Sequence, residues 1–366
     1  MAAAHALYVG GDVIHAFAMD PETGALEPIA APTEVGGGFM CFSADWSTLY
    51  TTDGPAGAAA LRVLENGALE HISTTPTLLR GNAHIAVVAA GGSSAVVLSS
   101  YGSGGVNILR VNSDTGGLEE PVEGTQQQHV GGSGAHPTRQ AAPHPHSNFV
   151  DPSGTRVLVS DLGQDKLYQY AVDVDAGTLT QQRVVETAPA AGPRHCVFSP
   201  SGEWVYGINE LDCTINAYSY NVGDGTMSAA QATVSTLPEG YENDGPPSAT
   251  NAEGGVASAK NSTADIHVTP DGRFLFGSNR GHDSLVCFEI DQDDGSKLRL
   301  VGWTPTYGTH PRNFGIHPSG KWLVVANQNS DSVVLFRLDP TSGALTREGD
   351  PISVTGKPRC IKFRPC

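Results

Sequence analysis

Short apolar runs separated by turn residues recur along the chain, as in 156–160 (RVLVS), 204–208 (WVYGI) and 322–326 (WLVVA). Runs rich in β-branched and aromatic residues and bounded by Gly, Pro and Asp are typical of β-strands. A helical period of 3.6 residues is nearly absent, and helix start and stop signals are lacking. The pattern therefore predicts an all-β protein built from short strands.

One turn motif recurs seven times. A small polar or acidic residue usually precedes a glycine, and an apolar residue follows the glycine two or three positions later. The seven glycines are Gly24, Gly67, Gly116, Gly177, Gly225, Gly295 and Gly343. They lie 43 to 70 residues apart, and the residues after Gly343 and before Gly24 together make one more unit of similar size. Seven units that close by combining both termini indicate a circular array.

A second turn motif lies roughly halfway along these units and reads apolar-x-Pro-[Ser/Asp]-Gly. Its copies are centred on Pro152, Pro200, Pro270 and Pro318, with degenerate copies at 42–45 and 88–92. Two hairpin turns per unit give four strands, which is one blade of a propeller. We therefore predict a single-domain, seven-bladed β-propeller over residues 1–366, closed by pairing of Ala6–Phe17 with Pro358–Phe363.

The longest interval between turns contains an insertion at 237–264, which includes the segment EGYENDGPP. An insertion of this length is either a functional cover or a disordered excursion. The sequence leaves both interpretations open.

Charge, hydropathy and cysteine spacing limit which partners and which cellular compartment the chain can have. The chain has 21 basic and 38 acidic residues, a net charge of −17, which disfavours nucleic acid as a partner and requires a local basic site for any anionic substrate. No apolar run approaches the ~20 residues of a membrane-spanning helix, and the N-terminus lacks a signal-peptide pattern. The six cysteines form no C-x-x-C pair, so we expect no zinc knuckle, buried reduced thiols and a cytoplasmic protein.

Cationic residues recur just before the Pro-x-Gly turns. They are His84, His146, Arg194, His267, Arg312 and Arg359. The innermost strands of a propeller converge on its axis, so these side chains are expected to gather at one mouth of a central channel, where they would bind an anion. The structural alternative is that they cap strands or pair with acids between blades.

Polar residues also follow the next strand of each unit. Asp165, Asp283 and Asp331 each precede an apolar strand and are explained by turn chemistry. Glu210 and Arg280 stand where the other units carry small residues, and turn chemistry does not explain them.

Five segments carry a specific resemblance. They are 143–148 (PHPHSN), 192–202 (GPRHCVFSPSG), 206–211 (YGINEL), 278–284 (SNRGHDS) and 308–314 (GTHPRNF). In these segments the chain resembles the seven-bladed propeller lactonases, a family that includes bacterial 6-phosphogluconolactonases and fungal carboxy-cis,cis-muconate cyclases. The resemblance spans all blades and is strongest from Pro143 to Phe363. Gly38-Phe-Met-Cys and Ser99-Ser-Tyr depart from the family pattern.

The resemblance implies hydrolysis of a small anionic sugar lactone, first of all 6-phosphogluconolactone to 6-phosphogluconate in the pentose phosphate pathway. It also implies a site without metal or organic cofactor, in a monomer or weak homo-oligomer. The catalytic residues carried over are His146, Arg194, Glu210 and Arg280. His146 or Glu210 would activate water, and the two arginines would bind the anion and stabilise the transition state. His195, His310 and Arg312 are candidates for binding the phosphate.

Other functions stay open on the sequence alone. A muconate-type lactonising cyclase would use the same residues. A non-catalytic propeller would serve protein interaction, and a Ca²⁺-dependent lactonase would need converging carboxylate and carbonyl oxygens, where this chain places His and Arg. Gly102-Ser-Gly and Gly132-Ser-Gly lack the nucleophile-elbow context and are interpreted as linkers.

Overall fold

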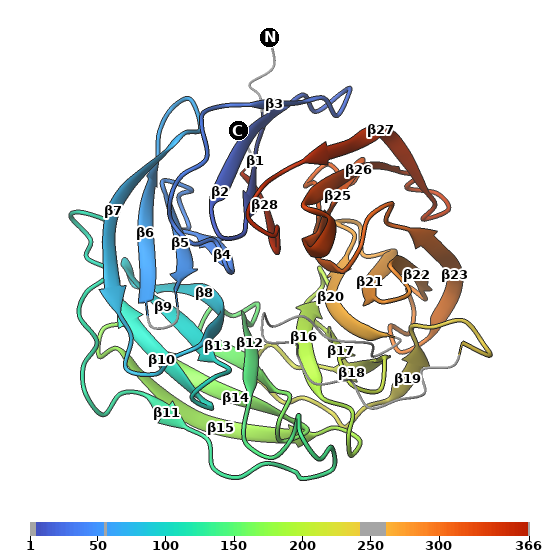
Figure 1. Cartoon of the computed structure of the whole chain (residues 1–366). Coiled ribbons are helices and arrows are strands. Elements are labelled where there is room, and N and C mark those ends of the chain that lie inside the picture. Colours follow the sequence, from blue (N-terminus) through green and yellow to red (C-terminus); the bar gives the residue numbers. More distant parts are fainter. Residues whose placement is uncertain (1–4, 55–56, 242–260, 365–366) are drawn as a thin grey trace.

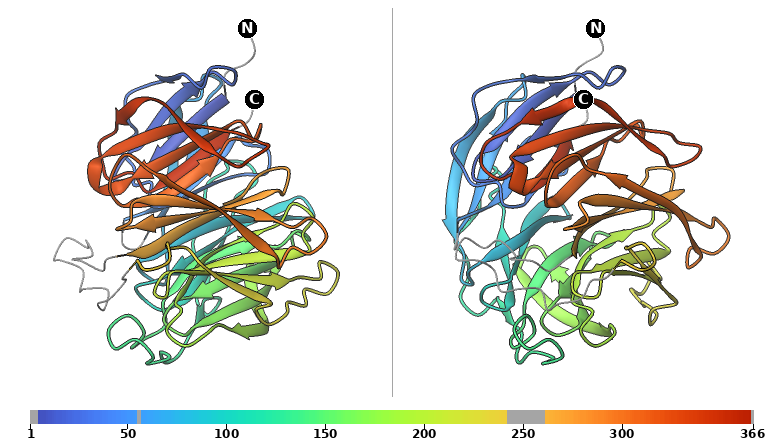
Figure 2. Two further views of the ribbon diagram at one scale, coloured as in Figure 1. Left: turned by 90° about the vertical axis from the view of Figure 1, so that its right-hand side faces the viewer. Right: turned by 45° about the vertical axis from the view of Figure 1, so that its right-hand side comes forward.

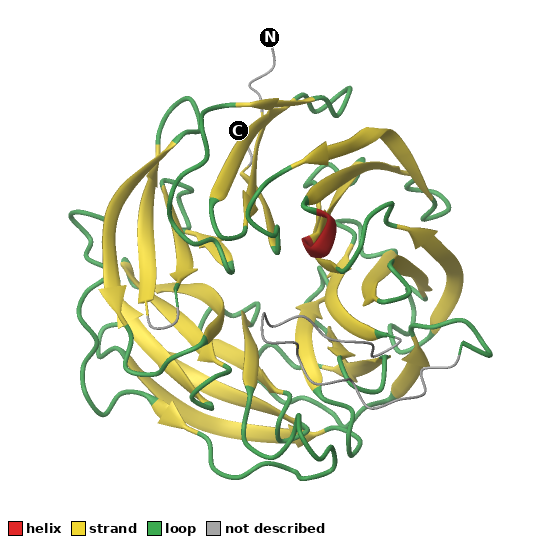
Figure 3. Ribbon diagram, in the orientation of Figure 1, coloured by secondary structure: helices red, strands yellow, loops and turns green. Residues whose placement is uncertain are grey.

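Seven four-stranded antiparallel sheets stand in a ring around a common axis (Figure 1). The computed structural model describes residues 5–54, 57–241 and 261–364. Within these ranges the only helical element is the 3₁₀ turn η1 (Gln328–Ser330), drawn in red in Figure 3. The predicted seven-bladed, all-β propeller is therefore confirmed. Most of the 237–264 insertion lies outside the described residues.

Each blade is one sheet, and its strands follow one another from the ring axis outwards. Blade 1 contains β28 (Cys360–Arg364), β1 (His5–Gly10), β2 (Ile14–Met19) and β3 (Leu26–Pro28). Blade 2 contains β4 (Met40–Phe42), β5 (Thr48–Asp53), β6 (Gly57–Val63) and β7 (Leu69–Pro76). Blade 3 contains β8 (Asn82–Ala90), β9 (Ser93–Ser100), β10 (Gly105–Arg110) and β11 (Gln127–Gln128).

Blades 4 to 7 continue the ring. Blade 4 contains β12 (Pro145–Val150), β13 (Arg156–Asp161), β14 (Lys166–Asp173) and β15 (Thr178–Glu186), and blade 5 contains β16 (Pro193–Phe198), β17 (Trp204–Asn209), β18 (Thr214–Ser219) and β19 (Ala232–Ser235). Blade 6 contains β20 (Ser262–Val268), β21 (Phe274–Arg280), β22 (Ser284–Ile290) and β23 (Leu298–Pro305). Blade 7 contains β24 (Pro311–Ile316), β25 (Trp322–Asn327), β26 (Ser332–Leu338) and β27 (Leu345–Ser353).

The ring closes in blade 1, where the last strand of the chain lies inside the first three. β28 pairs antiparallel with β1, and Leu7 stands opposite Phe363. The two strands lie side by side in Figure 1, and the blue and red parts of the chain adjoin in both views of Figure 2. Phe363 and Leu7 also belong to a core cluster that contains Trp322 of blade 7. The predicted closure by both termini is confirmed.

The seven repeated glycine turns join the third and fourth strands and dock on the preceding blade. A Cβ on Gly24 would lie 2.9 Å from Trp322, and one on Gly295 would lie 2.7 Å from Trp204. At three of these contacts a tyrosine hydroxyl donates to the glycine carbonyl: Tyr8 to Gly67, Tyr50 to Gly116 and Tyr206 to Gly295. The motif that marks the repeat in the sequence is thus the contact that joins one blade to the next.

Gly343 offers a direct test of this contact. Its φ is +72°, and a Cβ would lie 2.6 Å from Phe274 Cδ1. Gly343→Ala should therefore add overpacking to backbone strain and destabilise the fold by roughly 2–5 kcal/mol. Gly349 in the same blade has φ +67° with nothing within 4 Å, so Gly349→Ala should cost only the strain, roughly 1–2 kcal/mol. Thermal unfolding of both variants checks this, and equal losses would contradict the docking argument.

The five described cysteines are free, and four of them are buried, as expected from the sequence. Among the described residues, no helix has the length and apolar character needed to cross a membrane.

Candidate functional site

A β-bulge at the same place in four inner strands sets the direction of the candidate side chains. The pairing of β12 with β13 skips one residue between Pro145 and Ser147, and the skipped residue is His146. The same shift isolates Arg194 in β16 and Arg312 in β24. In β8 it isolates Ala83. An extra residue in one strand leaves the ladder and re-aims its side chain, and bulges are frequent beside active sites.

Glu210 is the centre of the site. It follows β17 directly, and its side chain is only 3% exposed. Its Oε2 accepts from Arg194 Nε at 2.9 Å and lies 3.0 Å from an Nη atom of Arg280. Its Oε1 accepts from Arg139 Nη2 at 2.6 Å. The structure therefore brings three of the four predicted catalytic residues, Arg194, Glu210 and Arg280, into one ion-pair cluster.

The electrostatics of this cluster favour an ionised carboxylate. Burial opposes the charge of Glu210, but Arg139, Arg280 and Arg194 hold the pKa of its carboxyl well below the ordinary value. Burial, together with the charge of Arg280, lowers the pKa of Arg194 to about 10. Both oxygens of Glu210 are engaged by cations, which leaves this carboxylate poorly placed to accept a proton.

Arg312 has no counter-ion among the residues that the structure describes. Within the described part of the chain its guanidinium has no hydrogen bond or ion pair, whereas Arg194 and Arg280 both pair with Glu210. Burial, followed by the charges of Arg194 and Arg280, lowers its pKa well below the usual value. A partly buried cation repelled by its neighbours is stabilised by an anion from outside the protein.

His146 lies beside this cluster in a neutral state. The residue is 5% exposed, and its Nδ1 is buried with no hydrogen-bond partner among the described residues. Burial, followed by the charges of Arg194 and His195, lowers its pKa well below 6.5. Its ring centroid lies 5.6 Å from that of Tyr101 and 5.3 Å from that of His195. A neutral imidazole with a free nitrogen is able to accept a proton at neutral pH.

The other two candidates for binding phosphate, His195 and His310, differ in their surroundings. His195 is 3% exposed, and both its ring nitrogens already have protein partners, Asp265 Oδ1 at 2.7 Å and Arg194 Nη1 at 3.2 Å. His310 lies with Arg280, Thr309 and Asp283 around a pocket of about 180 Å³. Burial, then Arg280 and Arg312, lowers the pKa of His310 to about 2, so its ring is neutral.

The expected equivalence of cations in six blades is wrong for two of them. His84 stands opposite Ser99, one position beyond the bulge, at the level of His195. In β20 the bulge falls on Ala264 and Asp265, and His267 lies farther along the strand, bonded to Asp265 at 3.0 Å. Because successive side chains of a strand alternate in direction, an offset of one residue sends a side chain elsewhere.

The predicted structural aspartates are confirmed. Asp165, Asp283 and Asp331 adopt left-handed φ values of 57°, 52° and 46°. Each accepts a backbone N–H from the segment entering the next blade, donated by Gly192, His310 and Lys357 respectively. They therefore link neighbouring blades and fix the approach to the inner strands.

Sequence analysis missed Arg139 and Tyr101. Arg139 lies in the 129–142 connection, in which the sequence analysis considered only Gly132-Ser-Gly, and it donates to both Glu210 and the Tyr101 hydroxyl. The neighbouring Gln140 is fully buried and donates to Leu162 O and Asp165 Oδ1, which anchors the connection. A buried glutamine in a Gly-rich segment leaves no periodic signal, so no sequence pattern pointed to Arg139.

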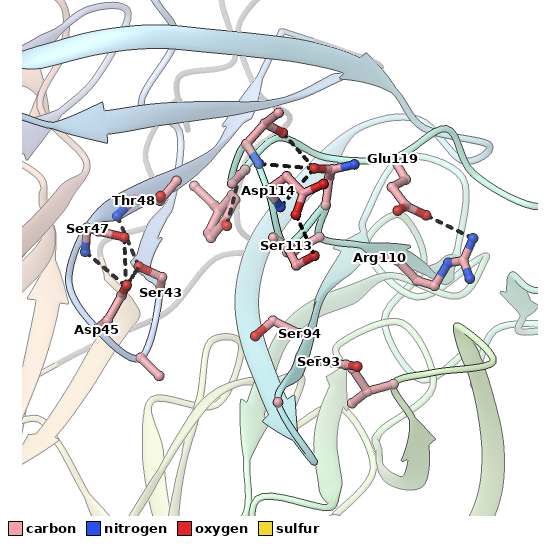
Figure 4. A pocket seen from close by; sticks show the side chains of 18 of the residues that line it. Ser43, Asp45, Ser47, Thr48, Ser93, Ser94, Arg110, Ser113, Asp114 and Glu119 are labelled. Atoms are coloured by element: carbon pink, nitrogen blue, oxygen red, sulfur yellow. Dashed lines mark hydrogen bonds and ion pairs between the residues drawn. The ribbon is translucent and has the colours of Figure 1, made fainter.

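A second cavity lies between blades 2 and 3, away from this cluster. It measures about 880 Å³ and is lined by Ser43, Asp45, Ser94, Asp114 and other polar residues (Figure 4). Its two arginines already pair with glutamates, Arg62 with Glu70 and Arg110 with Glu119, each at 2.8 Å. It therefore offers no free cation for an anionic substrate, and we place the candidate site at the Glu210 cluster.

Known proteins with similar sequences belong to a family of seven-bladed propellers. A family model described as "Lactonase, 7-bladed beta-propeller" matches residues 4–363. The 6-phosphogluconolactonase of Bacillus subtilis is 33% identical over 358 residues, covering 97% of this chain and 95% of that protein. The 6-phosphogluconolactonase of Formosa agariphila is 32% identical, covering 84% of this chain and 82% of that protein.

Solved structures give the same result. A protein from Bacteroides fragilis superposes with a TM-score of 0.85 at 28% identity, covering 100% of this chain and 99% of that one. The periplasmic gluconolactonase of Pseudomonas aeruginosa superposes with a TM-score of 0.84 at 28% identity, covering 98% of both chains. The chain belongs to the seven-bladed β-propeller lactonase family.

Proposed function

We propose that this protein hydrolyses a sugar lactone and that its substrate is 6-phosphogluconolactone, opened to 6-phosphogluconate. Family membership and the two curated relatives named above support lactone hydrolysis. The observation that supports a phosphorylated substrate is the guanidinium of Arg312, which faces Arg194 and Arg280 without a counter-ion among the described residues. The reaction is assigned to the cytoplasmic pentose phosphate pathway.

In this proposal His146 is the general base. Lactone opening requires a water to lose a proton as it attacks the carbonyl carbon, and the ring C–O bond then breaks. His146 is neutral and has an unpartnered buried nitrogen, whereas both oxygens of Glu210 are held by arginines. The proton taken up by His146 is returned to the leaving ring oxygen, which becomes a hydroxyl group.

Arg194 and Arg280 stabilise the oxyanion that forms on the carbonyl oxygen. Cations fixed before the reaction and aimed at the developing charge lower the barrier without reorganising during the step. Arg194 is held by Glu210, by Ala264 O and by His195, and Arg280 by Glu210 and by Thr263 O at 2.6 Å. Glu210 is therefore assigned to positioning both guanidinium groups.

Arg312 binds the phosphate, with His310 beside it. Arg312 offers a planar fork of N–H donors that matches a phosphate, and the neutral His310 offers one N–H. His195 is kept as a weaker candidate, since contact with phosphate would require it to release Asp265 or Arg194.

The decisive experiment compares phosphorylated and unphosphorylated gluconolactone. Arg312→Met should lower kcat/KM for 6-phosphogluconolactone by roughly 100-fold through a higher KM, because a charge-assisted hydrogen bond to phosphate contributes about 1.5–3 kcal/mol. The same variant should change kcat/KM for unphosphorylated gluconolactone by less than about 3-fold. Rates are corrected for spontaneous opening of each lactone.

Arg299→Met is the matched control, since the Arg299 side chain is 72% exposed on the outer strand β23. It should leave both rates unchanged. Equal losses on both lactones in Arg312→Met would overturn the phosphate assignment, and absence of opening of either lactone by the wild type would overturn the proposed function itself.

A further inference from the structure

A second layer of inner-strand residues directly follows the bulged residues His146, Arg194 and Arg312 and, in β20, the first of two bulged residues, Ala264. It contains Ser147, His195, Asp265 and Asn313, from four successive blades. Each of these side chains bonds to the next blade. Ser147 Oγ donates to Arg194 O, His195 to Asp265, and Asn313 Oδ1 accepts from Ile361 N. A continuous chain of hydrogen bonds therefore runs beneath the arginine cluster.

Asp265 is the anion of this layer. It is 2% exposed, and one of its oxygens, Oδ1, accepts from His195 and from no other described residue. The other oxygen, Oδ2, accepts from three donors: His267 Nε2 at 3.0 Å, Asn313 Nδ2, and Phe314 N at 3.3 Å. Although burial opposes its charge, His267 and His195 hold the pKa of this carboxyl well below the ordinary value.

The partners of His195 define its tautomer. A carboxylate only accepts, so His195 Nδ1 carries the hydrogen that faces Asp265. A guanidinium only donates, so His195 Nε2 presents its lone pair to Arg194 Nη1 at 3.2 Å. The bulge in β16 lets Arg194 and His195, adjacent in sequence, meet in this way.

We propose that Asp265 is a positioning residue that fixes His195 as the Nδ1–H tautomer, so that His195 Nε2 accepts from Arg194 and orients its guanidinium for the reaction. This inference rests on the proposed function, in which Arg194 stabilises the transition state. Partners that orient a functional group from behind typically change its activity by about 10–100-fold when they are removed.

Asp265→Asn tests the tautomer directly. The amide oxygen should turn to the three donors formerly bound to Oδ2, which places the amide NH₂ against His195 Nδ1. His195 must then carry its hydrogen on Nε2, where it faces the Arg194 donor. The ¹⁵N chemical shifts of the His195 ring should therefore show the Nδ1–H form in the wild type and the Nε2–H form in the variant. The His195→Gln spectrum assigns these signals.

Kinetics provide the second readout. Asp265→Asn should lower kcat for 6-phosphogluconolactone about 10–100-fold with little change in KM. In a His195→Gln background the same substitution should cost less than about 3-fold, because residues that act in series are not additive. His267→Gln removes another partner of Asp265 without contacting Arg194, and it should stay within about 3-fold of the wild type.

The outcomes separate this inference from the proposed function. An unchanged His195 tautomer in Asp265→Asn overturns the inference, as does an equal loss of kcat in the two backgrounds. An inactive wild type overturns the proposed function, and the tautomer measurement, which needs no substrate, still decides whether Asp265 controls His195.

Discussion

Glu210→Gln is expected to reduce lactone opening on the order of 10³-fold. One carboxylate holds the buried Arg194 and Arg280 and the partly buried Arg139, so its loss releases three cations at once. Misplacement of a reacting group by 1 Å costs roughly 100-fold, and two of these arginines are assigned to the oxyanion. The loss should appear in kcat, measured by steady-state hydrolysis of 6-phosphogluconolactone.

The same substitution should lower stability. Removal of one partner from a buried ion pair typically costs about 3–5 kcal/mol, since the remaining charge is left unpaired. Because the pKa of Glu210 is held below its ordinary value in the folded protein, its contribution is present above the unfolded pKa and is lost as the pH falls through the folded pKa. The pH dependence of thermal unfolding measures this loss.

Glu203→Gln is the matched control for both measurements, because Glu203 is an exposed glutamate in the same blade, just before β17. It should match the wild type in rate and in unfolding temperature. A Glu210→Gln protein with full turnover would remove Glu210 from the mechanism.

His146→Ala is expected to reduce kcat/KM by about 10²–10⁴-fold, the range for loss of a general base. Burial and the nearby cations hold the pKa of His146 well below 6.5, so the neutral, base-competent form persists on acidification. The wild-type kcat/KM should therefore stay level from about pH 8 to pH 6 instead of falling near 6.5. Initial rates across this range, corrected for spontaneous opening, give the profile.

His71→Ala is the control for His146→Ala, since His71 is exposed on β7 and bonds only to Thr74 among the described residues. It should leave the profile unchanged. A His146→Ala enzyme that retains wild-type kcat/KM would rule out His146 as the base.

Local turn chemistry explains how much of the fold was predictable. The repeated glycines were visible because each one docks on the preceding blade, as Gly343 does on Phe274, and the packing tolerates no Cβ there. The closure by β1 and β28 followed from counting seven units across both termini. Arg194 was predicted from the cations that precede the Pro-x-Gly turns, and Glu210 and Arg280 from equivalent positions of adjoining blades where turn chemistry does not explain them. The family resemblance joined the three into one site.

What the sequence could not predict depends on single-residue register and on contacts between distant segments. Motif alignment placed His267 beside Arg194, but the bulge of β20 falls on Ala264 and Asp265, so Asp265 takes the place of His195 in its own blade. Arg139 reaches Glu210 from 71 positions away through an irregular connection. A bulge shifts the alternation by one position at the end of a short strand, and such a contact leaves no trace in hydrophobic periodicity.

The pairing of β28 with β1 also determines when blade 1 can be completed during translation. Gly10 pairs with Cys360, 350 positions later, so blade 1 lacks its innermost strand until Cys360–Arg364 has been made. At a translation rate of about 5–20 residues per second, the edge of β1 that pairs with β28 stays unpaired for on the order of half a minute. Translation that stops before β28 leaves that edge permanently open, so truncated chains should associate through β1 and require removal by chaperones or proteases.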